Sequence, residues 1–340
     1  MRHNDRFQMP PGAKVVGSQG SNIHMQVSMP LDEDGFLGRQ CPTCGLDFRM
    51  DGQQYDALPN QLELWCVYCG HHAEHSAFTT PQQRERLLQA ARNLGEQLVS
   101  NALDDIFRGL SRSTSRRSAV SFSYKSKPSL PRPLPGINEE RLIRVRTCTG
   151  CELRYAIFGE HRYCPVCGKL PAATIAFDAL QADSVRLDAL SDLPHEAQAT
   201  LREQGVFTRN WVDTIENVVG VVEALADSAF WTAVANAEDL LRGKGNIFQR
   251  LDDMADLFVS QGYDDLRHRL GPEVWRRLTE TWAARHLFTH NDGVVDDRYL
   301  NRVPTSTARP GQRLVISDAI CRQALQDARA LCTALTELTA

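Results

Sequence analysis

Residues 41–45 read CPTCG, and a second cysteine pair follows at residues 66–70 as CVYCG. The same C-x2-C spacing returns at residues 148–151 and 164–167. A C-x2-C turn can direct both thiolates at one ion, and two such turns on neighbouring hairpins complete a tetrahedral shell. The four pairs therefore predict two zinc ribbons, each holding one Zn2+ ion. The predicted ligands are Cys41, Cys44, Cys66 and Cys69 in the first ribbon and Cys148, Cys151, Cys164 and Cys167 in the second.

Disulfide bonds and a redox pair are the alternatives for these eight cysteines. Disulfides need an oxidising compartment, and the polar, proline-broken N-terminus lacks the apolar core of a signal peptide. A thioredoxin-type site would show one C-x2-C inside a βαβ pattern. We therefore expect a cytoplasmic protein with two structural zinc ions, because four thiolates leave no open coordination position for catalysis. Cys321 and Cys332 lie in a helical pattern, where we expect them to be small buried hydrophobic side chains.

The 340-residue chain has an ordinary globular composition, with 42% hydrophobic and 24% charged residues. Its net charge of -4 excludes a uniformly basic nucleic-acid binder. No run approaches the ~18 consecutive apolar residues of a membrane-spanning helix. Residues 181–340 hold 17 Lys and Arg against 24 Asp and Glu, which leaves 21 against 18 in residues 1–180. The two halves differ in charge, and we expect them to have different partners.

Composition and periodicity divide the chain into six segments. We expect an extended arm at 1–36, the first zinc ribbon at 37–80, a helix at 81–108, a basic Ser- and Pro-rich linker at 109–137, the second zinc ribbon at 138–178 and a helical domain at 180–340. Thr80 can cap the helix, Pro81 suits its first position and Gln83 completes a capping box. The helix should pack on another element, because it carries an apolar stripe of Leu87, Leu88, Ala91, Leu94, Leu98, Ala102 and Ile106.

Two features of the N-terminal half leave alternatives open. Residues 106–138 contain seven Lys and Arg and no acid, which suits either a segment that tracks a phosphate backbone or a solvated linker. The aromatic side chains beside the cysteine pairs could stack on bases or cover a small core; they are Trp65, Tyr68 and Tyr163. Because the first quartet is already complete, we expect His71, His72 and His75 at the surface or beside the ligands.

Beyond residue 180, apolar residues recur at helical spacing and strand signals are scarce. A long segment begins at Asn210, and others follow at about 236–262, 272–291 and 316–338. These patterns predict an all-α bundle of roughly five helices. The expected fold class is mainly α, with a helical bundle at the C-terminus and two small β zinc-ribbon modules in the N-terminal half.

The helix expected at 272–291 places three polar side chains at the end of its buried stripe. The stripe consists of Val274, Trp275, Leu278 and Trp282. At about 100° per residue, Arg285, His286 and His290 flank its continuation. Polar groups there need partners or line a cleft.

The run 285–290, RHLFTH, matches the R-x4-6-H motif of HEPN domains, in which a polar residue follows the arginine. The chain resembles this family over about residues 205–338, including the run 291–300 and the final helix. HEPN domains are small helical bundles that commonly dimerise. Active members are metal-independent endoribonucleases of toxin–antitoxin, phage-defence and RNA-processing systems. The resemblance implies an RNA substrate, a homodimer through the helical domain and, in toxin systems, an antitoxin or regulatory protein partner.

The resemblance also implies roles for the three motif residues. Arg285 would steady the scissile phosphate, His290 would act as general acid and base, and His286 would fill the polar position. Arg285 and His290 lie about 140° apart around the helix, so a two-fold axis could assemble two pairs around one phosphate. Two other interpretations stay open. The domain could bind RNA, nucleotide or a partner without cleaving, or His286 and His290 could ligate a metal or satisfy the core.

Overall fold

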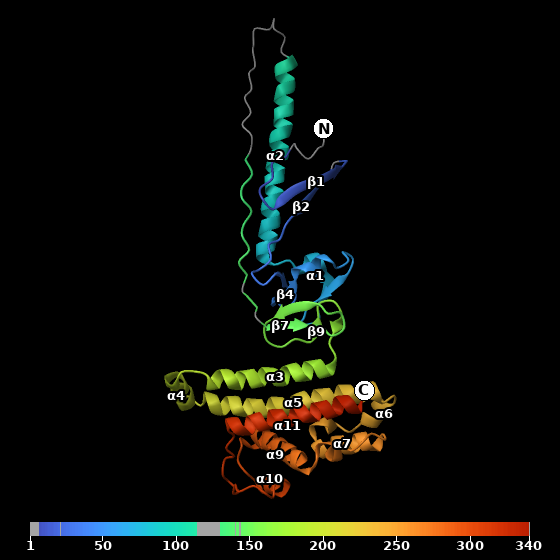
Figure 1. The fold of residues 1–340 in the computed structure, drawn as a ribbon, viewed down its shortest axis with the longest axis vertical. Helices are drawn as coiled ribbons and strands as arrows, with labels where there is room; N and C mark the ends of the chain where they lie inside the picture. The colour runs from blue at the N-terminus through green and yellow to red at the C-terminus, as the bar shows by residue number, and fades with distance from the viewer. Residues whose placement is uncertain (1–6, 21, 114–129, 140, 143, 340) are drawn as a thin grey trace. The chain divides into compact units, whose positions relative to one another are not determined.

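The computed structural model describes residues 7–20, 22–113, 130–139, 141, 142 and 144–339. The chain divides into two compact units, Met1–Lys169 and Leu170–Ala340. It is mainly helical, with small β-sheets in the N-terminal half (Figure 1), as the sequence predicts. The helical unit begins earlier than the expected residue 180, because the second ribbon ends at Lys169. None of the helices in the described ranges is long and apolar enough to cross a membrane.

The two ribbons share one antiparallel sheet, although we expected two separate modules. Its strands lie in the order β3 (Phe36–Gln40), β4 (Asp47–Asp51), β8 (Arg154–Ile157) and β7 (Arg144–Thr147). The inner strands pair with Arg49 opposite Ala156 and Met50 opposite Tyr155. Each ribbon adds a short second hairpin, formed by β5 (Glu63–Trp65) with β6 (His72–Glu74), and by β9 (Tyr163–Cys164) with β10 (Gly168–Lys169). Helix α1 (Gly52–Asp56) and the 3-10 helix η2 (His75–Phe78) complete the first ribbon.

The expected extended arm at 1–36 is wrong for residues 13–27. They form a β-hairpin of β1 (Ala13–Gln19) and β2 (Asn22–Val27). Gly20 adopts a φ of 59° at its turn, a backbone conformation that glycine adopts without steric cost. Burial alternates along both strands, and β2 also alternates between polar and apolar residues in its sequence, NIHMQV, so a strand signal was available there.

Helix α2 (Pro81–Ser113) begins where its capping box predicts. The Thr80 hydroxyl accepts from Gln83 N at 3.2 Å, and Gln83 Oε1 accepts from Thr80 N at 3.3 Å. The end of the expected linker runs along this helix: Asn93 Nδ2 donates to Arg132 O at 2.8 Å, and Arg132 N donates back to Asn93 Oδ1 at 3.0 Å. Most of the basic linker, including Arg116, Arg117, Lys125 and Lys127, lies outside the described residues.

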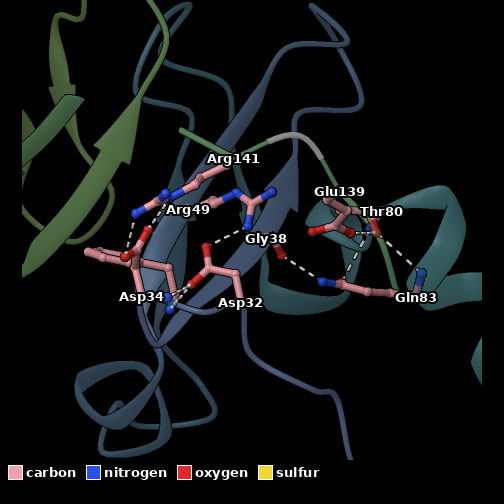
Figure 2. Close-up of polar contacts among 9 residues, drawn as sticks. Asp32, Asp34, Gly38, Arg49, Thr80, Gln83, Glu139 and Arg141 are labelled. Carbon is pink, nitrogen blue, oxygen red and sulfur yellow. Dashed lines mark hydrogen bonds and ion pairs between the residues drawn. The ribbon is translucent and has the colours of Figure 1, made fainter. Parts of the chain in front are cut away.

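A polar network joins the start of α2 to the shared sheet (Figure 2). Gln83 Nε2 donates to Gly38 O at 2.8 Å, and the Thr80 hydroxyl donates to Glu139. Glycine at position 38 makes room for the Glu139 carboxylate, since a Cβ there would lie 1.8 Å from one of its oxygens and would displace that side chain. Two ion pairs complete the network, Arg49 with Asp32 at 2.5 Å and Arg141 with Asp34 at 2.6 Å.

The helical unit has four long helices instead of about five, and short helices connect them. The long helices are α3 (Ala172–Ser191), α5 (Val206–Ala233), α9 (Pro272–Asn291) and α11 (Asp318–Leu338). The connecting elements are α4 (His195–Glu203), α6 (Ala237–Leu241), η3 (Ile247–Gln249), α7 (Leu251–Ser260), α8 (Leu266–Leu270) and α10 (Asp297–Arg302). Helices α3, α5, α9 and α11 contribute to one apolar core. Cys321 and Cys332 are fully buried in it, as predicted.

Candidate functional sites

The eight paired cysteines form two quartets, as the sequence predicts. Within each quartet the four sulfur atoms lie within 4.8 Å of one another. The shortest distances between sulfur atoms of different pairs are 3.7 Å for Cys41–Cys69 and 3.6 Å for Cys151–Cys164. A tetrahedron with metal–sulfur bonds of about 2.3 Å has edges of about 3.75 Å, whereas a disulfide bond is about 2.05 Å long. The quartets therefore suit one metal ion each, consistent with zinc.

The surroundings of the sulfur atoms also suit a cation. Gly150 N and Val166 N each lie 3.4 Å from a ligand sulfur, and both donate to it. Burial raises the pKa of Cys41, but hydrogen bonds from the Cys44 and Thr43 backbone, together with those to the Cys66 and Cys69 side chains, hold that pKa below its usual value. Burial raises the pKa of Cys167 to about 12. A bound cation would be needed to keep such a thiol ionised at neutral pH.

The two ribbons face each other about a pseudo-two-fold axis. Cys41 and Cys148 are equivalent, because each is the first ligand of its ribbon. Arg49 and Ala156 are separated by the same number of residues as these two cysteines, so they occupy equivalent positions in the two ribbons. These two residues are paired with each other between the inner strands of the shared sheet, so the pseudo-axis passes through this pair. The packing of the ribbons is therefore isologous, as in a two-fold dimer, but within one chain.

The second hairpins of the two ribbons, β5–β6 and β9–β10, are related by the same pseudo-two-fold symmetry. Trp65 and Tyr163 each precede the first cysteine of a pair, and their rings stack with centroids 5.9 Å apart and planes 2° apart. Trp65 N donates to Pro165 O at 2.9 Å, and Tyr163 N donates to Val67 O at 3.1 Å. Gly70 follows the last ligand of the first ribbon, and a Cβ there would lie 2.4 Å from the Tyr163 ring.

These contacts decide between the two roles left open for the aromatic side chains. Trp65 lies between Tyr163 and His72, whose ring is 4.1 Å away. The Tyr68 hydroxyl donates to Asp47 O at 2.7 Å and accepts from Phe158 N at 2.8 Å. All three aromatic side chains are thus engaged within the ribbons, which favours the packing role over base stacking.

The three motif residues of α9 line a single cavity of about 260 Å3. His286 and His290 lie with ring centroids 4.6 Å apart. Arg285 lines the same cavity although it is about 140° from His290 around the helix. The structure therefore brings all three together in one chain, without a second copy.

Helix α10 adds two further cations to this cavity, Arg298 and Arg302. The helix is fastened to α9 by Tyr299 and Val303, which belong to one apolar cluster with Ala283 and Leu287. Asp296 caps it by accepting from Tyr299 N at 2.8 Å. The sequence analysis missed these arginines. Their spacing of four residues on a helix just after the motif was the available signal.

The cavity has an excess of unpaired positive charge. In the described part of the chain no acid pairs with Arg285, Arg298 or Arg302, and Arg285 Nε is buried without a hydrogen-bond partner. The acid among the lining residues, Asp252, accepts from Trp275 Nε1 at 3.0 Å. Ten other arginines of the helical unit do pair with acids: Arg186, Arg209, Arg242, Arg250, Arg267, Arg269, Arg276, Arg277, Arg313 and Arg322.

The electrostatics of the cavity favour an anionic ligand. Burial lowers the pKa of His286, and the charges of His290, Arg298, Arg302 and Arg285 lower it further. A bound phosphate would offset this repulsion and satisfy the arginines. A metal ion would add to the repulsion. Among the described residues, three or more metal-binding side chains come together only in the cysteine quartets, so the histidine pair has no third ligand there.

No protein-family model, curated protein or solved structure matches the chain. The resemblance to HEPN domains therefore rests on the sequence motif alone.

Proposed function

We propose that the helical unit binds a phosphodiester in the cavity at the end of α9 and cleaves RNA there without a metal, as HEPN ribonucleases do. One observation carries the proposal: Arg285, Arg298 and Arg302 surround a single cavity with the two motif histidines, and none of the three arginines pairs with an acid in the described residues. Unpaired arginines in a partly enclosed site are suited to phosphate.

The roles follow from the environments of the side chains. The three arginines hold the phosphate and the negative charge that develops on it. The lowered pKa of His286 keeps its ring neutral at pH 7, so that it can accept the proton of a ribose 2′-OH. His290 is exposed at the helix end and donates a proton to the leaving 5′-oxygen. Attack of the 2′-oxygen on phosphorus breaks the bond to that oxygen and leaves a 2′,3′-cyclic phosphate.

A second candidate function is binding of RNA or a nucleotide without cleavage. The acidic balance of residues 181–340, 17 bases against 24 acids, favours a single nucleotide over a long RNA as the ligand, because such a surface repels a long polyanion outside the cavity. Under either function, the ribbons and the basic linker are recognition modules, and the cytoplasm is the proposed location because its thiols stay reduced. A homodimer through the bundle and an antitoxin partner remain part of the HEPN proposal.

Cleavage of a structured RNA by the full-length protein tests the proposal. EDTA should not stop the reaction at concentrations that spare the cysteine-bound metal. His290→Ala should slow cleavage about 10²- to 10⁴-fold, and Arg285→Ala about 10²- to 10³-fold. Arg298→Ala should also slow it, while Arg309→Ala, an exposed arginine outside the cavity, is the matched control.

The products separate the two candidate functions. Cyclic phosphate ends, and no cleavage of the 2′-deoxy analogue, support attack by the 2′-OH. If the wild type binds the RNA but leaves it intact, or if His290→Ala cleaves as fast as the wild type, the binding function takes the place of the nuclease.

A further inference from the structure

Helix α2 carries most of its large apolar residues on the side that faces away from its own unit. Six large apolar side chains on it are exposed, among them Val99 at 62% and Ile106 at 58%. The outward apolar stripe of α2 consists of Leu87, Leu88, Val99, Leu103 and Ile106, while Leu98 lines a cavity with Val15 and Ile23 of the β-hairpin. The sequence predicts that the apolar stripe of α2 packs on another element, but within the described chain only Leu94 of that predicted stripe is buried, beside Ala90. Exposed stripes of this size mark contact surfaces.

The side of α2 that does pack on its unit is polar. Gln83, Asn93 and Gln97 are each at most 6% exposed. Their amides bond to extended backbone: Asn93 to Arg132, and Gln97 to both the N–H and the carbonyl of Gln8. This is the reverse of an ordinary surface helix, whose apolar side faces the core. The helix is therefore held by hydrogen bonds on one side and keeps its apolar side for a partner.

We propose that this partner is α2 of a second copy of the chain, packed antiparallel along the stripe. Reversal about residue 97 places an apolar or small residue opposite each of these five residues. Leu88 then lies opposite Ile106, and Leu103 lies opposite Ala91. Val99 lies opposite Gly95, whose missing side chain lets the two backbones approach closely. In a parallel pair, by contrast, Val99 would meet Val99 and Gly95 would meet Gly95.

The charges beside the stripe favour the same arrangement. Arg84 and Arg92 lie on the outward side of the N-terminal half. The antiparallel register brings one of these arginines towards an acid of the second copy. Arg92 is six residues, about 9 Å, from the partner's Glu96. A parallel pair would place each arginine beside its own equivalent, which is repulsive.

Sedimentation of the full-length protein tests the interface independently of any RNA cleavage. The mass of the wild-type assembly should halve in Val99→Glu, because the new carboxylate enters an apolar contact in both copies. Leu130→Glu, at a residue that is 75% exposed outside α2, is the matched control and should keep the wild-type mass. A monomeric wild type at all concentrations, or an unchanged mass in Val99→Glu, would overturn the proposal.

Cross-linking tests the direction. Leu88→Cys and Ile106→Cys proteins are mixed and oxidised, with wild type as the control for native cysteines. The antiparallel pair should give a cross-linked dimer in the mixture and none with Leu88→Cys alone. A dimer formed by Leu88→Cys alone would show parallel packing and overturn the register.

Discussion

Each unit has a cavity lined by arginines, and the two cavities use them differently. The cavity of the ribbon unit, about 550 Å3, is lined by Arg49 and Arg141, and each is bonded to an aspartate. The cavity at the end of α9 is about half as large, about 260 Å3, and leaves Arg285, Arg298 and Arg302 without an acid in the described residues. Paired arginines stabilise the fold that surrounds them. Unpaired arginines in a cavity are available to a ligand.

The two units also differ in the interactions that stabilise them. The ribbon unit relies on two cysteine quartets and on side-chain bonds to backbone, such as those of Gln83 and Asn93. The helical unit has one apolar core with Phe230 and Phe258 fully buried. One unit should therefore depend on metal for its stability, and the other should not.

The largest expected effect follows from the shared sheet. Cys148→Ser should remove the metal from the second ribbon and also destabilise the first, because β4 pairs with β8. Structural zinc contributes roughly 10–16 kcal/mol in small domains, more than the ribbons can replace. The helical unit should keep its circular dichroism and its melting temperature. Metal analysis and limited proteolysis check both units.

The matched control is Cys332→Ser, in the fully buried core of the helical unit. It should retain both ions and lower the melting temperature of the helical unit only. If Cys148→Ser leaves one ion bound and the first ribbon resistant to protease, the ribbons are independent modules, as the sequence predicts.

The sequence predicted the ligands but not the arrangement of the ribbons. A C-x2-C turn is local, so all eight ligands could be read from spacing. The pairing of Arg49 with Ala156 joins residues far apart in the chain, and neither strand carries a signal for its partner. The capping box at Thr80 was likewise local and is confirmed. The hairpin at residues 13–27 was missed although Ile23, Met25 and Val27 alternate with polar residues, because a register shift between Val15 and Gly17 interrupts the pattern of its first strand.

The candidate cavity was predictable only in part. Arg285, His286 and His290 share one helix, so helical angles placed them near its buried stripe. Arg298 and Arg302 come from another helix, and only the packing of Tyr299 on the α9 cluster brings them to the site. Whether an arginine is paired with an acid also depends on tertiary contacts, which spacing does not give.

An intermediate effect tests the pseudo-two-fold packing of the ribbons. Gly45 and Gly70 both follow a cysteine pair of the first ribbon, and both have a φ of 73°. Alanine at either position costs about 1–2 kcal/mol of backbone strain. Gly45 faces open space, whereas a Cβ on Gly70 meets the Tyr163 ring, which adds about 1–3 kcal/mol of overpacking. Gly70→Ala should therefore unfold at a clearly lower urea concentration than Gly45→Ala. Equal urea midpoints for the two variants would show that the Tyr163 ring moves away from the new methyl group without a loss of stability.

The smallest expected effect is a pH dependence confined to the helical unit. The pKa of His286 lies below its usual value because of burial, and then because of His290, Arg298, Arg302 and Arg285. A bound phosphate favours the protonated ring, so binding takes up a proton, and affinity should rise as pH falls below about 6.5. One coupled proton allows at most about a tenfold change per pH unit.

Fluorescence anisotropy with a 2′-O-methyl RNA, which cannot supply the attacking hydroxyl, measures this binding without cleavage. His286→Gln should flatten the rise in affinity, whereas His268→Gln, on α8 outside the cavity, should not. Stability without RNA should change in the opposite direction. Since the lowered pKa means that the unfolded chain binds more protons, the free energy of unfolding should decrease as pH falls through about 6.5. An anion bound beside His286 favours the protonated ring, so its affinity must change with pH. An affinity of the wild type that stays constant from pH 7.5 to 5.5 would therefore contradict phosphate binding beside His286.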